Sequence, residues 1–122
     1  MTTPEYQNGQ IATACWRAAQ NDLHQVMLSV LMVFLNRAEA ESKDLYEVVT
    51  EWLAENPTPF PDTRDPQFQQ FLSRMETVIT KLVPDKTGGA LWFVPKDQLT
   101  AGMLEAFQET TRIGSLIFIK EK

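Results

Sequence analysis

The segment 23–35 reads LHQVMLSVLMVFL, and Asn36 and Arg37 follow it directly. Residues 26–35 are apolar with one exception, Ser29. A helix of this composition has no face suited to water, yet it is shorter than the roughly 20 apolar residues that cross a bilayer. The segment therefore predicts a helix that is buried nearly all round in a small domain, with the rest of the chain covering it.

The composition is typical of one globular domain that covers residues 1–122. Of the 122 residues, 43% are hydrophobic and 22% are charged, values typical of a folded globular chain. The formal net charge is −5, and Lys and Arg form no cluster along the sequence. Nucleic-acid binding is therefore not expected, because it needs a basic face to meet phosphates. A membrane span is not expected either.

The chain has one cysteine, Cys15, and one histidine, His24. An internal disulfide and a Cys/His zinc site are therefore excluded, and we expect neither a metal nor another cofactor. Cys15 lies in the apolar run IATACW, which favours a buried thiol over a nucleophile paired with His24. Residues 1–10 lack the basic flank and apolar core of a secretory signal, so no such signal is expected.

Helical spacing also appears before and after the central segment. Pro4 suits the first turn of a first helix. The apolar stripe of that helix consists of Ile11, Ala14, Cys15 and Ala18. Asn21 or Asp22 can cap the central helix, and Ser42 or Asp44 can cap a third one. The apolar stripe of the third helix consists of Leu45, Val48, Val49, Trp52 and Leu53.

A proline-rich loop separates the third helix from a fourth. Four prolines between Pro57 and Pro66 exclude regular structure there, and Phe60 is expected to anchor the loop to the core. Asp65 and Pro66 provide a cap and a first turn for the fourth helix. Apolar residues keep helical spacing until Pro84 ends it.

The last third of the chain predicts a small β element. Residues 85–89 (DKTGG) form a turn, and residues 90–94 (ALWFV) are rich in strand formers. A short helix is expected over 101–110, with Met103, Leu104 and Phe107 facing inward. Residues 113–122 read IGSLIFIKEK and predict a strand, apolar on both faces, that pairs with 90–94. The sum is a mostly helical α+β domain: four or five helices around one buried helix, with a small antiparallel β element.

Four separated segments carry a family resemblance. They are WRAAQND at 16–22, LNRA at 35–38, DKTGGALWF at 85–93 and RIGSLIFIK at 112–120. In this order they resemble motifs of the cell-wall hydrolase family that includes the spore cortex-lytic enzymes: E-A-R-G-E, L-N-R, D-x-T-x-G-A-x-H-Y-H and R-I-G-x-H-x-F. The resemblance implies a small lysozyme-like or lytic-transglycosylase-like domain that cleaves the glycan strands of peptidoglycan.

In that family a glutamate is implied to act as the general acid. A glycosidic oxygen leaves poorly until it is protonated, and a carboxylic acid in a partly apolar cleft keeps its proton near neutral pH. Such proton transfer contributes roughly 10²–10⁴-fold in rate. The position that matches the glutamate is Ala18, which has no proton to donate. Asp22 matches the second acid of the motif, and Gln20 replaces its arginine.

The downstream motifs lose polar groups as well. Trp92, Phe93 and Val94 occupy the positions of His-Tyr-His, and Leu116 that of a histidine. Candidates to line a substrate groove are Trp16, Ala18, Gln20, Asn36, Trp92 and Phe93. Each also has a structural interpretation: the aromatic residues and Ala18 as core, and Asn36 as the polar end of a buried helix.

Three hypotheses follow. The first is a degenerate, non-catalytic homologue that serves as a binding, structural or interaction module for peptidoglycan glycan or a protein partner. The habits of the family add a phage or prophage context. Because no secretory signal is expected, the location is expected to be cytoplasmic or in a phage particle. The second is an active glycosidase or lytic transglycosylase that uses a substitute acid, with Asp22 as the first candidate. The third is an unrelated helical protein.

Overall fold

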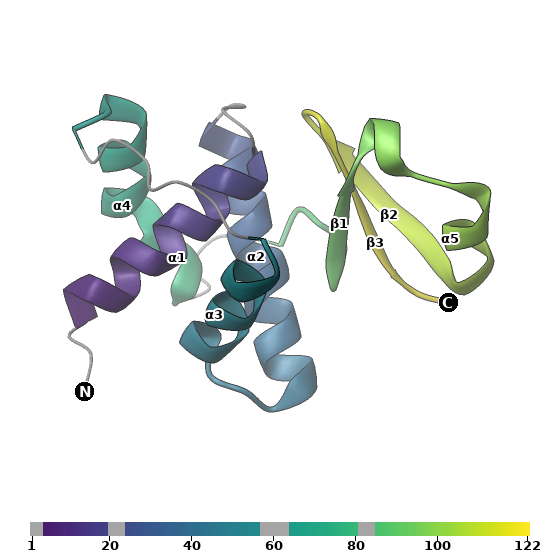
Figure 1. The fold of residues 1–122 in the computed structure, drawn as a ribbon, viewed down its shortest axis with the longest axis horizontal. Helices are drawn as coiled ribbons and strands as arrows, with labels where there is room; N and C mark the ends of the chain where they lie inside the picture. The colour runs from purple at the N-terminus through teal and green to yellow at the C-terminus, as the bar shows by residue number, and fades with distance from the viewer. Residues whose placement is uncertain (1–3, 20–23, 57–63, 81–84) are drawn as a thin grey trace.

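The central helix α2, His24–Glu41, is surrounded by other elements of the chain (Figure 1). Helices α1 (Pro4–Ala19), α3 (Leu45–Glu55) and α4 (Pro66–Ile79) all contact it, and so does strand β1 (Trp92–Pro95). This computed structural model describes residues 4–19, 24–56, 64–80 and 85–122. In the described helices no segment is long and apolar enough to cross a membrane.

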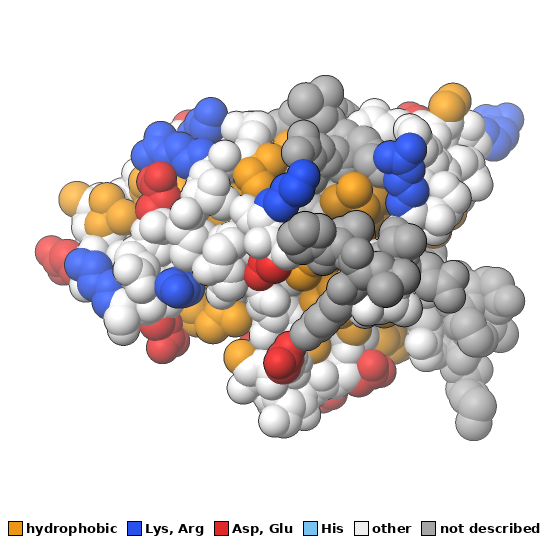
Figure 2. All heavy atoms as spheres, turned by 180° about the vertical axis from the view of Figure 1, so that it is seen from behind, with side chains coloured by type: hydrophobic (Ala, Val, Ile, Leu, Met, Phe, Trp, Pro, Cys, Tyr) orange, Lys and Arg blue, Asp and Glu red, His pale blue; other side chains and the backbone are white. Residues whose placement is uncertain are grey.

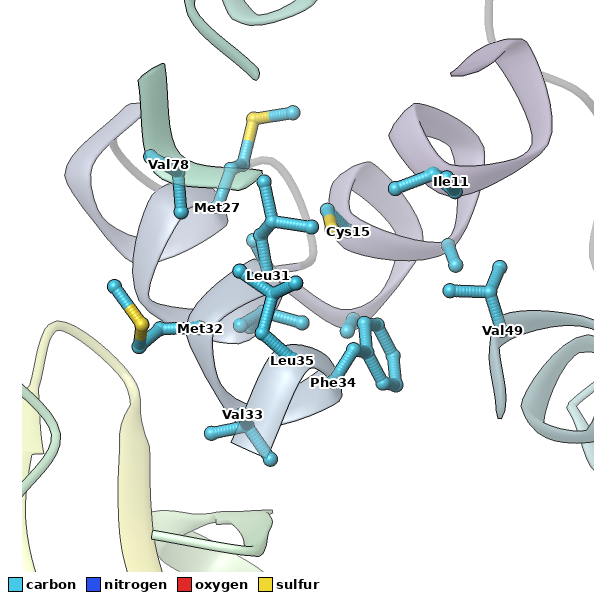
Figure 3. Packing of buried hydrophobic residues seen from close by; sticks show 14 of the residues in the cluster. Ile11, Cys15, Met27, Leu31, Met32, Val33, Phe34, Leu35, Val49 and Val78 are labelled. Atoms are coloured by element: carbon cyan, nitrogen blue, oxygen red, sulfur yellow. The ribbon is translucent and has the colours of Figure 1, made fainter. Parts of the chain in front are cut away.

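The burial of α2 confirms the prediction made from its composition. Residues 30–35 are six consecutive buried positions, more than a full turn, so the helix has no solvent-facing side there. Figure 3 shows Leu31 pointing toward Cys15 of α1, while Met32 and Phe34 project from different sides of α2. Each fully buried side chain of this size contributes about 1.5–3 kcal/mol relative to exposure. The helix therefore forms the centre of the hydrophobic core.

The helix termini confirm some of the predicted caps and correct another. Asp65 accepts a hydrogen bond from the backbone N–H of Gln67 (2.8 Å) at the start of α4. Asp44 holds the N-cap position of α3 without a side-chain cap bond. Ser42 is not a cap of α3: its φ of 55° lies in the left-handed region, and it ends α2 instead. The predicted caps Asn21 and Asp22, the anchor Phe60 and the end at Pro84 lie outside the described residues.

A three-stranded antiparallel sheet, in the order β1-β3-β2, lies beside α2 (Figure 1). Strand β3, Leu116–Glu121, pairs with β1, so that Phe93 lies opposite Phe118. This confirms the predicted pairing, with β1 beginning two residues later than expected. Strand β2, Phe107–Ile113, is joined to β3 by a tight turn in which Gly114 has φ 59°.

The predicted helix over 101–110 is partly wrong. Helix α5 ends at Ala106, and the residues after it form β2. The later residues include Thr110, Thr111 and Ile113, whose β-branched side chains favour a strand once β3 offers a partner. Phe107 therefore lies in the sheet, and Leu104 is 40% exposed instead of facing inward.

Strand β3 is apolar on both faces, as predicted. Leu116 and Phe118 pack into the main core with α2. Ile117, Ile119 and Val94 form a second cluster, packed against by residues of the segment 96–106 and by neighbouring strand residues. That segment contains the 3-10 helix η1, Lys96–Gln98, and α5, Ala101–Ala106, which Figure 1 shows on the side of the sheet away from the helices.

Candidate functional site

A hollow of about 490 Å³ lies where the end of α1, the end of α3 and strand β1 meet. Helix α1 contributes Arg17 and Ala18 to it. Its other lining residues are Trp52, Glu55 and Asn56 from the end of α3, and Phe93, Val94, Pro95 and Gln98 from β1 and η1. The size lies within the range of small-molecule sites.

The methyl group of Ala18 lines this hollow. Ala18 is 6% exposed and belongs to the apolar stripe of α1 that packs on the core. It is therefore a core residue whose one accessible side meets the hollow.

Two aromatic rings, Trp52 and Phe93, line the hollow beside Ala18. Their centroids are 6.2 Å apart with an interplanar angle of 45°. Both rings rest edge-on against Phe34 of α2, at 5.8 Å for Trp52 and 5.9 Å for Phe93. Such contacts fix ring orientation, with about 0.5–1.5 kcal/mol per pair beyond area burial. The central helix therefore sets the position of both rings.

Of the polar side chains that line the hollow, one has a hydrogen-bond partner among the described residues and three have none. The side chain of Asn56 donates to the carbonyl oxygen of Trp52 (2.9 Å) and so closes the end of α3. Arg17, Glu55 and Gln98 are exposed, and within the described part of the chain their side chains form no hydrogen bond or ion pair. These three side chains are available to a ligand.

Away from the hollow, the carboxylate of Asp85 accepts the hydrogen bonds that hold the turn leading into β1. Its Oδ1 accepts from the N–H (2.8 Å) and the hydroxyl (2.6 Å) of Thr87, and its Oδ2 accepts from the N–H of Gly89 (3.1 Å). The amide of Asn36 donates both to Asp85 Oδ2 (3.1 Å) and to the carbonyl oxygen of Ala90 (3.0 Å). The turn is thereby fastened to the end of α2.

These contacts determine the protonation of Asp85. Burial raises its pKa, but the hydrogen bonds from Thr87, Asn36 and Gly89 outweigh burial and hold the pKa below its ordinary value. Asp85 is therefore ionised at neutral pH and unsuited to donating a proton. It acts as the acceptor that organises the turn.

Strand β2 completes the attachment of this turn. The pairing of β2 with β3 shifts register between Glu109 and Thr111, so Thr110 forms a β-bulge. Its hydroxyl donates toward the carbonyl oxygen of Thr87 and contacts that of Phe118. Gly88 has φ +69°, and a Cβ there would lie 3.2 Å from the Cβ of Thr110. Only glycine fits this approach without strain.

The structure brings together some of the predicted groove residues and separates others. Ala18 and Phe93 both line the hollow. Trp16 is half-buried against the core, and Asn36 belongs to the Asp85 turn. Trp92 lies on the outer side of β1 against Phe107, with ring centroids 5.2 Å apart. Gln20 and Asp22 lie outside the described residues.

Sequence reasoning missed several residues of the hollow. Arg17 directly precedes Ala18 in the motif segment, which is the one signal that could have marked it. Glu55 follows Glu47 and Glu51 at helical spacing, a pattern typical of a solvated helix face, and Gln98 had no signal. These residues come from three separate segments, and only the packing of β1 against the helices brings them to one place.

Other chemistry is not supported by the described residues. Cys15 is fully buried, and burial raises the pKa of its thiol well above the ordinary value, as expected for a core cysteine. Among the residues described, no three His, Cys, Asp or Glu side chains lie close enough to hold a metal ion. On the face that Figure 2 shows, acidic and basic side chains are interspersed, and the described residues form no basic stripe there.

Replacing Ala18 with glutamate tests whether the hollow accommodates an acid. We expect Ala18→Glu to fold, with its carboxyl poorly hydrated beside Trp52 and Phe93 and its pKa above the ordinary value of about 4.3. A raised pKa in the folded state means that stability falls as pH rises through that pKa. Relative to Ala18→Gln, the variant should lose about 1–2 kcal/mol between pH 4 and pH 8 in urea unfolding. Identical pH profiles for the two variants would contradict the expectation.

Comparison with known proteins identifies the fold. No protein-family model and no curated protein matches the chain. The structure is similar to the catalytic domain of the Bacillus cereus SleB protein, with a TM-score of 0.68, 21% identity, and coverage of 98% of this chain and 93% of that one. It is also similar to the catalytic domain of the germination-specific lytic transglycosylase SleB from Bacillus anthracis, with a TM-score of 0.69, 18% identity and 97% coverage of both chains.

The match confirms the expected fold. A lysozyme-like α+β domain with the fold of these two SleB catalytic domains extends over nearly the whole chain. The hypothesis of an unrelated helical fold is wrong.

Proposed function

We propose that this chain is a non-catalytic relative of peptidoglycan lytic transglycosylases that binds glycan strands in the hollow beside Ala18. The observation that carries the proposal is the combination of a hollow with a methyl group at the position where the resemblance requires the acid. The SleB domain from Bacillus anthracis is described as a lytic transglycosylase, an enzyme that acts on such strands.

The aromatic rings support binding to a sugar. A sugar ring presents an apolar face of C–H groups and an edge of hydroxyl groups. Trp52 and Phe93 offer apolar surface of suitable size, and Arg17, Glu55 and Gln98 offer polar groups around it. The hollow therefore combines two aromatic rings with several polar groups, and convergent polar groups of this kind fix the orientation of a bound small molecule.

The chemistry of the described residues argues against cleavage. Ala18 has no proton to give, Asp85 is held ionised, and Cys15 is buried. The positions at which the resemblance expects histidines carry apolar side chains, among them Leu116 in the core and Val94 in the second cluster.

Binding is tested with purified protein and insoluble peptidoglycan. We expect the protein to sediment with peptidoglycan and to release no soluble muropeptides. Trp52→Ala should weaken binding about tenfold, because one wall of the hollow is removed. Trp92→Ala removes the same side chain on the outer side of β1 and should leave binding unchanged. Equal binding by both variants would contradict the placement of the glycan.

Because Trp52 also packs on Phe34, its replacement affects stability. Gln98→Ala provides a second test, since Gln98 is exposed and lines the hollow without a partner among the described residues. We expect it to lower affinity while the melting temperature stays unchanged.

An active enzyme with a substitute acid is the second candidate. Glu55 favours it, because its carboxyl lines the hollow. Asp22, which aligns with the second acid of the motif, stays a candidate from the sequence. Release of muropeptides that Glu55→Gln or Asp22→Asn abolishes would establish this function, and no release by the unaltered protein would exclude it. A protein partner and a phage context stay predictions from the resemblance.

A further inference from the structure

We infer that the hollow selects a glycan that bears a carboxylate, and that Arg17 is the residue that binds it. The inference rests on the proposed function, because it names the kind of glycan that the same hollow takes. It assigns to Arg17 a role in specificity that neither the fold nor the motif resemblance gives it.

The first observation is the state of Arg17. The chain has 16 Asp and Glu residues against 11 Lys and Arg, so an arginine has many acidic groups available. Arg37 pairs with Glu41 (3.3 Å) and Arg112 with Glu109 (2.9 Å). Arg64 and Arg74 also interact with other residues. In the described chain Arg17 is the arginine whose side chain has no such partner, and it is the one cation that lines the hollow.

The second observation is the position of Arg17 next to Ala18. Both lie in the last turn of α1, and both line the hollow. A sugar ring that lies on Trp52 or Phe93 directs its substituents toward the edge of the hollow. A carboxylate there can meet the fork of N–H donors of Arg17 in two parallel hydrogen bonds.

The third observation is that the hollow is lined by one positive and one negative side chain, Arg17 and Glu55, which do not pair with each other. Glu55 lines the same hollow, yet it forms no ion pair with Arg17. A carboxylate on Arg17 leaves Glu55 to accept from a hydroxyl or acetamido N–H group of the same ligand. Gln98 can donate or accept. The hollow therefore fits a sugar with one acidic substituent and several neutral polar ones.

In peptidoglycan such a carboxylate has two sources: the lactyl ether of a muramic sugar from which the stem peptide has been removed, and the stem peptide itself. The probes are four tetrasaccharide ligands: peptide-free glycan with a free lactyl group, the same glycan with that group converted to a neutral amide, glycan with intact stem peptides, and neutral chitotetraose. Affinities are measured by isothermal titration calorimetry at two salt concentrations.

We expect the unaltered protein to bind the free-lactyl glycan about tenfold more tightly than its neutral amide and chitotetraose, as charge-assisted bidentate bonds allow. Raising the salt concentration should reduce this preference. Arg17→Gln should abolish the preference, because it lowers the affinity for the free-lactyl glycan far more than the affinity for chitotetraose. Arg17→Lys should restore part of it, because lysine keeps the charge without the fork. Arg112→Gln, the same charge change in a paired arginine, should have no effect.

The outcomes separate this inference from the proposed function. Equal affinity for all four ligands, unaffected by Arg17→Gln, would overturn the role of Arg17 while glycan binding stands. An Arg17-dependent preference for the glycan with stem peptides alone would support the inference and assign the carboxylate to the peptide. Binding of none of the ligands would overturn both.

Discussion

Replacing Phe34 with alanine is expected to lower the free energy of unfolding by about 3–5 kcal/mol, a value typical of a fully buried phenylalanine. Phe34 is 0% exposed and lies on the central helix. Its ring contacts Trp52 of α3 and Phe93 of β1, and thus connects helices to sheet. The cavity left behind borders three elements that cannot close on it without moving apart from their other contacts.

The effect is measured by urea unfolding followed by circular dichroism. Leu104→Ala is the control, because Leu104 is an exposed apolar residue of α5 and should change stability by less than about 0.5 kcal/mol. Phe34→Ala should also weaken glycan binding under conditions where the variant remains folded, since both rings of the hollow lose their support. A loss of stability below about 1 kcal/mol would contradict the role of Phe34 as the contact between α2, α3 and β1.

Replacing Asp85 with alanine is expected to cost about 2–4 kcal/mol. Four donor groups lose their acceptor: the N–H and hydroxyl of Thr87, the N–H of Gly89 and the amide of Asn36. Hydrogen bonds to a charged group contribute about 1.5–3 kcal/mol each, but part of the site is open to water, which replaces some of them. Thr87 is 0% exposed and gains no such replacement.

The same carboxylate makes stability depend on pH. The pKa of Asp85 is lower in the folded protein than its ordinary value, because its hydrogen bonds outweigh the opposing effect of burial. Its contribution is therefore fully present above the ordinary value of about 3.9 and is lost as pH falls through the lower folded pKa. Asp85→Asn should reduce the loss of stability below about pH 4.

Asp85→Asn also separates charge from geometry. An asparagine oxygen can still accept from Thr87, but its NH₂ group cannot accept from Gly89 or Asn36. We expect a smaller destabilisation than for Asp85→Ala. Asp97→Asn removes an exposed carboxylate on η1 and should leave the acid-side profile unchanged. An unchanged profile for Asp85→Asn as well would show that another group controls acid unfolding.

The pattern of kept and lost motif residues has a structural explanation. Asp85, Thr87 and Asn36 are among the motif residues that this chain keeps, and they fasten the turn before β1 to α2. Ala18 and Leu116, at positions where the resemblance expects an acid and a histidine, are buried apolar residues. The scaffold that shapes the hollow is thus maintained by hydrogen bonds independent of the proton donor.

The sequence by itself determined the elements whose signal is local and long. Ten nearly unbroken apolar residues require burial of α2, and the 3.6-residue spacing in α1, α3 and α4 specifies which side packs on it. The apolar faces of β3 and the pairing with β1 followed in the same way, because both strands lack a polar side. The Asp65 cap is a contact within two residues, which a local pattern can predict.

Only the tertiary structure decided the shorter elements and the site. Helix α5 and strand β2 share a segment without strong periodicity, and pairing with β3 settles where one ends and the other begins. The alternation of β1 sends Phe93 into the hollow and Trp92 to the outer cluster, although the two are neighbours in sequence. Arg17 and Glu55 meet at one hollow because α1 and α3 both pack against α2. Such proximity depends on packing between distant segments, which no local pattern encodes.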